Sequence, residues 1–140
     1  MNNTFTLVNF NKNDIELVKI LKENSLINCR NEIDVGYVSN SLKKCDIGFY
    51  FFDSVKPVAF ICTSIFNSCE LHVTILCSVK NTNKYRMRLI NYVITYAKNN
   101  NYKEVTLERD DKLENYYKKF GFIIYHRDVC NLILMKINLS

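Results

Sequence analysis

Hydrophobic positions along the chain change their spacing several times, and each change marks a different kind of element. Apolar residues that recur every three or four positions predict helices, whereas short apolar or alternating runs predict strands. The predicted strands cover residues 4–8, 47–52, 58–66, 71–79, 105–107, 122–125 and 129–137. The predicted helices cover residues 13–24, 32–42, 83–99 and 111–119.

Local signals support several of these boundaries. Asn13 and Asp14 are suited to cap the first helix, whose residues Ile15, Val18 and Leu21 we expect to face inward. Asp111 and Glu114 have the spacing of a capping box, and Gly121 is placed to end the helix that follows them.

The order of elements predicts one α/β (α+β) domain spanning residues 1–140. Residues 47–79 form an antiparallel meander in this prediction, with a turn at residues 53–57. The strand, helix and strand that follow predict a right-handed parallel crossover. We expect a mixed, mostly antiparallel sheet flanked by about four helices.

Composition is that of a soluble globular protein. Hydrophobic residues make up 48% of the chain and charged residues 24%, and no apolar run has the length needed to cross a membrane. The formal net charge of +5 suits an anionic cofactor or a nucleic acid. The cationic cluster of Lys84, Arg86 and Arg88 comes with no recognised nucleic-acid-binding motif, so we expect no nucleic-acid partner.

Six cysteines are present, and no two have CxxC spacing. Cys62 and Cys77 lie in apolar runs, where buried free thiols are expected, and a reduced, cytoplasmic protein follows. Cys69 and His72 give a C-x-x-H pattern, but two ligands do not make a metal site, so we predict no metal.

The segment over residues 71–122 carries a more specific signal. Residues 90–107 read INYVITYAKNNNYKEVTL, and residues 114–122 read ENYYKKFGF. These two stretches resemble the GNAT superfamily of acyl-CoA-dependent N-acetyltransferases: the helix after the cofactor loop with the next strand, and the later Tyr-containing helix that ends in Gly-Phe. The resemblance implies the GNAT fold, with a sheet splayed at its centre.

The resemblance also implies a site for acetyl-CoA. Main-chain groups of Leu76 and Cys77 would hold the pantetheine arm, commonly beside a bulge. The pyrophosphate loop aligns with six residues, which are Asn81, Thr82, Asn83, Lys84, Tyr85 and Arg86. Lys84 and Arg86 stand where the family has glycines, so their side chains either obstruct the phosphates or pair with them.

Catalytic roles follow from the same resemblance. Tyr117 matches the residue that protonates the departing thiolate, although packing in the core is the alternative for this side chain. For the base that accepts the proton of the amine, the candidates are Glu70, His72 and Glu108, or a water chain. His126 reads as a rim residue of the hairpin.

The resulting hypothesis is an N-acetyltransferase that moves an acetyl group from acetyl-CoA directly to a primary amine. The acceptor is a small molecule or a peptide, and the exposed last strand is a candidate for pairing in a homodimer. The alternative is a catalytically inactive GNAT-fold protein that acts as a binding or regulatory module.

Overall fold

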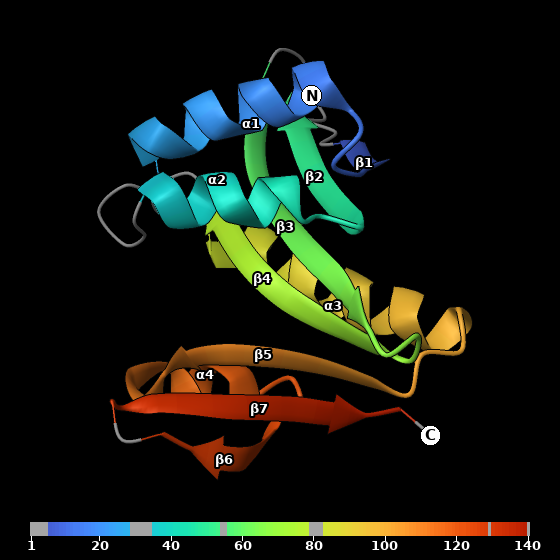
Figure 1. Cartoon of the computed structure of the whole chain (residues 1–140), viewed down its shortest axis with the longest axis vertical. Helices are drawn as coiled ribbons and strands as arrows, with labels where there is room; N and C mark the ends of the chain where they lie inside the picture. The colour runs from blue at the N-terminus through green and yellow to red at the C-terminus, as the bar shows by residue number, and fades with distance from the viewer. Residues whose placement is uncertain (1–5, 29–34, 54–55, 79–82, 129, 140) are drawn as a thin grey trace.

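A computed structural model shows a seven-stranded sheet with helices on both faces (Figure 1). It describes residues 6–28, 35–53, 56–78, 83–128 and 130–139. The strands are β1 (Thr6–Phe10), β2 (Ile47–Asp53), β3 (Lys56–Phe66), β4 (Glu70–Ser78), β5 (Glu104–Asp110), β6 (Ile123–Arg127) and β7 (Leu132–Asn138). The helices are α1 (Ile15–Asn28), α2 (Val35–Lys43), α3 (Asn83–Asn99), the 3-10 turn η1 (Asp111–Leu113) and α4 (Glu114–Lys118).

The strands lie in the order β1-β2-β3-β4-β5-β7-β6. β4 and β5 pair in parallel, and the other neighbouring pairs of the described sheet are antiparallel. The parallel pair is joined through α3, as the crossover prediction requires. The predicted α/β (α+β) class and the mixed, mostly antiparallel sheet are therefore confirmed.

Two hydrophobic clusters lie on opposite faces of the sheet. α3 and α4 bury one cluster, which includes Leu89, Val93 and Tyr117. α1 and α2 bury the other against β3 and β4, with Leu21 and Leu42 fully covered. Each helix thus covers a defined side of the strands that carry the candidate site (Figure 1).

Helix α3 has the regularity that its apolar stripe predicts. Leu89, Ile90, Val93 and Ala97 are at most 4% exposed, because positions three and four apart share one helical face. The helix ends where the asparagines begin, and Asn101 adopts a φ of 66°, which asparagine tolerates better than most residues.

Several predicted boundaries are wrong by a few residues. The first strand ends at Phe10, two residues beyond the predicted end, and α1 continues to Asn28 and does not end near residue 24. β5 runs to Asp110 because β7 pairs with it along its whole length, from Asn138 to Leu132.

Three local predictions need correction. Ile15 is 78% exposed and does not face inward; it lines the open hollow between β1 and the start of α1. The capping side chain before η1 is that of Asp110, which accepts from the Lys112 N–H, and not that of Asp111. The last strand, β7, lies between β5 and β6, so β6 is the edge strand.

Gly48 of β2 provides a test of this packing. A Cβ atom at Gly48 would lie 2.5 Å from the ring of Phe10 and 2.7 Å from the Sγ atom of Cys45. We expect Gly48→Ala to lower the free energy of unfolding by roughly 1–3 kcal/mol in urea denaturation, the usual range for overpacking. Adding Phe10→Leu should recover part of this loss, and strict additivity of the two changes would contradict the clash.

Candidate active site

The sheet opens at its centre because β4 and β5 pair over only part of their lengths. Their ladder runs from Glu70 opposite Glu104 to Val73 opposite Leu107, and then stops. β4 continues to Ser78 and β5 to Asp110 without further pairing between them. Figure 1 shows the two strands close together where they begin and apart where they end. The expected central splay is therefore present.

An extra residue in β4 accompanies the opening. Cys62 of β3 pairs with Ile75 and Thr63 pairs with Val73, which leaves Thr74 as a bulge. Before the bulge, Val73 packs in the α3 cluster; after it, Leu76 takes that face and Ile75 the opposite one. A bulge shifts the two-residue alternation by one position. The strand therefore changes its side-chain phase where its parallel partner leaves.

On the face covered by α4, Tyr117 lies deep in the core. It is 1% exposed, and its ring packs edge-on against Phe122 and Tyr116. Its hydroxyl oxygen accepts a 3.3 Å hydrogen bond from Nε of Arg109. Arg109 belongs to the end of β5 that pairs with β7 but no longer with β4. Tyr117 thus packs in the core, as the alternative for this side chain predicted, and its hydroxyl contacts β5; its role as the acid stays a prediction.

On the opposite face, three polar side chains form a hydrogen-bonded chain. The hydroxyl of Thr106 on β5 donates to Oε2 of Glu70 over 2.5 Å. Nδ1 of His72 lies 2.8 Å from the same hydroxyl oxygen. Thr106 is 1% exposed, whereas the side chains of His72 and Glu70 are 20% and 16% exposed. Register places them together, because Glu70 and His72 pair with Glu104 and Thr106.

Charge on this face is mainly negative. Glu104 and Glu108 project from β5 on the same face as Glu70. The pKa of Tyr125 on β6 is raised mainly by burial and further by the negative charge of these three carboxylates. Lys136 lies 3.9 Å from Glu104 and sits over the Tyr125 ring. Such a face favours a cationic group over an anionic one.

The start of α3 carries the predicted loop residues. Asn81 and Thr82 lie outside the described residues, and α3 begins at Asn83. Lys84 is exposed, with its ammonium 5.1 Å from the centre of the Tyr85 ring. Tyr85 is 4% exposed and packs on Phe51, so its side chain belongs to the core.

Arg86 points differently from Lys84. Its side chain is half-buried and lies near Tyr116 of α4, where burial raises the pKa of Tyr116 and the Arg86 charge partly opposes that rise. Nε of Arg86 is buried and has no hydrogen-bond partner among the residues that the structure describes. A buried guanidinium N–H without an acceptor is costly, so this atom fits an anionic oxygen between α3 and α4.

The remaining predicted residues are dispersed around the splay. Leu76 and Cys77 are 5% and 3% exposed, as expected for residues that would act through main chain. Cys77 is disulfide-bonded, so the expectation of a free thiol there is wrong. Glu108 is exposed and lies one residue after the ladder between β4 and β5 ends. His126 is exposed on β6.

Two residues that the sequence did not single out complete the site. Thr106 lies within the predicted strand 105–107 and Arg109 lies two residues beyond it, on opposite faces of β5 because strand side chains alternate. A longer predicted β5 would have included Arg109. What the sequence could not show is the β4–β5 register that brings Thr106 to His72.

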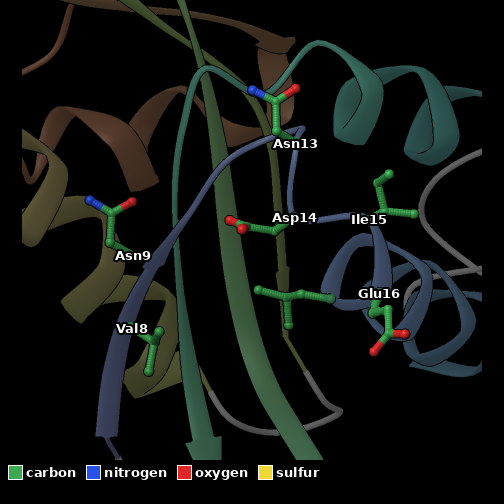
Figure 2. A pocket seen from close by; sticks show the side chains of 7 residues that line it. Val8, Asn9, Asn13, Asp14, Ile15 and Glu16 are labelled. Atoms are coloured by element: carbon green, nitrogen blue, oxygen red, sulfur yellow. The ribbon is translucent and has the colours of Figure 1, made fainter.

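A separate hollow of about 500 Å³ lies between β1 and the start of α1 (Figure 2). Its lining comprises Val8, Asn9, Asn13, Asp14, Ile15, Glu16 and Leu17. None of the candidate residues takes part, and β1 is separated from β4 by two strands. Figure 2 shows Asp14 within it, and that carboxylate already accepts the N–H of Asn11.

Across the described ranges, no group of three or more metal-ligating side chains comes together. None of the described helices combines the length and the apolar character required to cross a bilayer.

No protein-family model matches this sequence, and no curated protein matches it either. Solved structures do match over almost the whole chain. An aminoglycoside 6'-acetyltransferase type Ii superposes with a TM-score of 0.75 at 16% identity, over 96% of this chain and 97% of that one. The ribosomal-protein-S18-alanine N-acetyltransferase from Escherichia coli gives a TM-score of 0.75 at 12% identity, over 98% and 95%.

A third match contains the acyl carrier itself. This aminoglycoside 6'-N-acetyltransferase, solved in complex with coenzyme A, superposes with a TM-score of 0.72 at 15% identity, over 96% of this chain and 97% of that one. These three structures share the overall fold of this chain over almost its whole length. The chain has the fold of the GNAT N-acetyltransferases.

Proposed function

We propose that this protein transfers an acetyl group from acetyl-CoA to a primary amine by direct attack. The observation that carries the proposal is the opening between β4 and β5, which has a tyrosine hydroxyl on one face and a carboxylate–hydroxyl–imidazole chain on the other. A thioester placed in the opening would meet a proton donor and a proton acceptor from opposite sides. Acyl transfer to an amine needs both.

Acetyl-CoA enters this proposal as the acyl-donor substrate. The part of β4 after the bulge offers main chain, at Leu76, to a group lying where β5 has diverged. A backbone N–H there would stabilise the charge that develops on the thioester oxygen. The positive end of α3 and the guanidinium of Arg86 would receive the phosphates.

Tyr117 is the proposed acid. Because Nε of Arg109 donates to its oxygen, the proton of the hydroxyl is left to point toward another acceptor. The leaving thiolate would be that acceptor as the carbon–sulfur bond breaks. Arg109 then acts as a positioning residue, since it holds the oxygen without supplying the proton.

The acceptor is proposed to be a cationic amine in its resting form. The face opposite α4 carries Glu70, Glu104 and Glu108, which attract a positive charge. Two structural neighbours act, by their descriptions, on aminoglycosides and on an alanine of ribosomal protein S18, and N-acetylation takes place at an amine. An aminoglycoside and a peptide with an N-terminal alanine are the first acceptors to try.

The second candidate function is a binding module of the same fold without catalysis. It is supported by Lys84 and Arg86 at the start of α3, which align with the glycines of the family's cofactor loop. A titration with acetyl-CoA separates the two functions, because a binding module without catalysis does not require acetyl-CoA.

We expect calorimetry to detect acetyl-CoA binding to the wild-type protein. Arg86→Gln should weaken it about tenfold, the equivalent of about 1.4 kcal/mol for one lost charge-assisted contact. Lys84→Gln is the matched control and should change it less, because Lys84 is exposed and turned toward Tyr85. Tighter binding by Arg86→Gly would mean that the side chain obstructs the site, and no binding at high micromolar concentration would defeat the transferase.

Deleting Thr74 tests the splay directly. Without this residue, Leu71, Val73 and Leu76 stay on the α3 face in regular alternation, so the core is kept while β4 loses its bulge. We expect the deletion variant to unfold cooperatively yet to lose acetyl-CoA affinity by more than about tenfold. Thr74→Ala keeps the bulge and should bind as the wild type does; equal loss in both variants would disprove the role of the bulge.

Replacing Tyr117 by Phe tests the acid. The ring is retained, so we expect an unchanged fold and unchanged acetyl-CoA affinity, with kcat lowered roughly 100-fold, within the usual range for a lost general acid. Tyr116→Phe on the same helix serves as the control and should retain most of the turnover. A Tyr117→Phe variant with wild-type turnover at every pH would remove the assigned role.

A further inference from the structure

The face opposite Tyr117 carries a side-chain arrangement that determines which nitrogen of His72 bears a proton. Thr106 has one hydroxyl proton, and the hydroxyl lies within hydrogen-bond distance of both Glu70 and His72. An ionised carboxylate only accepts, so the Thr106 proton is donated to Oε2 of Glu70. The contact from Nδ1 to Thr106 is then a hydrogen bond only if Nδ1 carries a proton.

This assignment leaves the other ring nitrogen as a lone pair. A neutral imidazole protonated at Nδ1 is unprotonated at Nε2, where it accepts protons. No residue in the described ranges forms a hydrogen bond with Nε2. Since Thr106 is buried and the His72 side chain is 20% exposed, the Nε2 edge of the ring is the accessible one.

We propose that Glu70, Thr106 and His72 form a relay that presents Nε2 of His72 as the base for the attacking amine. This deepens the proposed function and rests on it. Thr106 and Glu70 are positioning residues that act through His72. Glu70, a candidate base in its own right from the sequence, instead holds the hydroxyl that orients the imidazole.

The position of the ring is fixed from a second direction. Phe66 of β3 stacks on His72 with ring centres 4.9 Å apart and planes inclined by 16°. The imidazole is thus held at its Nδ1 edge by Thr106 and across its plane by Phe66. A base held in one orientation loses less freedom when the amine arrives.

The chemical step balances with the groups already named. The amine nitrogen bonds to the acyl carbon and gives a proton to Nε2 of His72. The carbon–sulfur bond breaks, and the thiolate takes a proton from Tyr117. The imidazolium then returns its proton to solvent, and Tyr117 regains one from solvent, so the net products are the amide and CoA.

Electrostatics around His72 suit a base that is neutral at pH 7. Burial lowers the pKa of His72 below its usual 6.5, while Glu70 raises it, Arg109 lowers it further and Glu108 raises it. Two carboxylates on the same face as the ring, those of Glu70 and Glu108, therefore act against burial, and the Arg109 guanidinium acts with it from the opposite face of β5. The active, neutral form is present above the lowered pKa and is lost as pH falls through it.

The tautomer can be measured without activity. The chain has two histidines, so a long-range ¹H–¹⁵N correlation spectrum of ¹⁵N-labelled protein, with His126→Gln for assignment, isolates His72. We expect His72 to show the pattern of a ring protonated at Nδ1, and Thr106→Val to shift it toward a mixture of tautomers. Thr106→Ser should restore the wild-type pattern. A wild-type ring protonated at Nε2 would overturn the relay.

Kinetics test the base. The probe is trifluoroethylamine, an amine already neutral near pH 7, with thiol release from acetyl-CoA as the readout. We expect His72→Gln to lower kcat about 100-fold. With kcat/KM calculated from the concentration of neutral amine, so that protonation of the amine itself is removed, the same change should abolish an acid limb that lies below pH 6.5 in the wild type. Thr106→Val should lower kcat about tenfold, and Thr106→Ser should rescue it.

Calorimetry with acetyl-CoA separates the two ideas. Normal binding in all the variants, with the losses confined to kcat, supports the relay. Absence of binding in the wild type defeats the proposed function itself. Binding together with an unchanged acid limb in His72→Gln overturns the relay alone. Binding without thiol release by the wild type defeats the transfer reaction, and the relay with it.

Discussion

The incomplete ladder between β4 and β5 is the constraint on which the rest of the structure depends. Parallel pairing lasts for four residue pairs and ends beside the Thr74 bulge. A strand that gains one residue twists locally and changes the side to which its following side chains point. The neighbouring strand, tied along its other edge to β7, does not follow, and the sheet opens between two rigid halves.

The same opening explains why chemistry is divided between the faces. Along β5, Thr106 and Glu108 point one way, and Leu107 and Arg109 the other, so one short strand supplies polar groups to both sides. Tyr117 reaches Arg109 from α4, and His72 reaches Thr106 from β4. The proposed acid and the proposed base are thereby kept apart, so that no proton passes directly between them.

Much of the architecture could be predicted because its signals are local. The stripe of α3 follows from helical periodicity, and the meander follows from three apolar runs with turns between them. The bulge is also visible in the hydrophobic pattern of the sequence. Leu71 and Val73 alternate with polar residues, whereas Ile75, Leu76 and Cys77 form an unbroken apolar run. A slip in alternation is what one inserted residue produces.

The site was less predictable because its contacts depend on register. Glu70 and Thr106 are 36 positions apart, and no local pattern shows that they share a hydrogen bond. Tyr117 could be located from the segment that precedes Gly-Phe, but not its partner Arg109. Cys77 is disulfide-bonded, and a disulfide needs a second cysteine elsewhere in the chain. The apolar neighbours of Cys77 alone therefore led to a wrong expectation.

At the start of α3, the proposed function requires that the fold keeps a phosphate site while its recognition chemistry changes. Glycines allow backbone N–H groups to approach phosphates, and such contacts are neutral dipoles held at fixed positions. A guanidinium at Arg86 would replace that geometry with a full charge on a flexible stem. Affinity would then depend more on ionic strength and less on backbone conformation. The buried, unpartnered Nε of Arg86 is the reason to expect this exchange, because an unfilled donor raises the energy of the ligand-free protein.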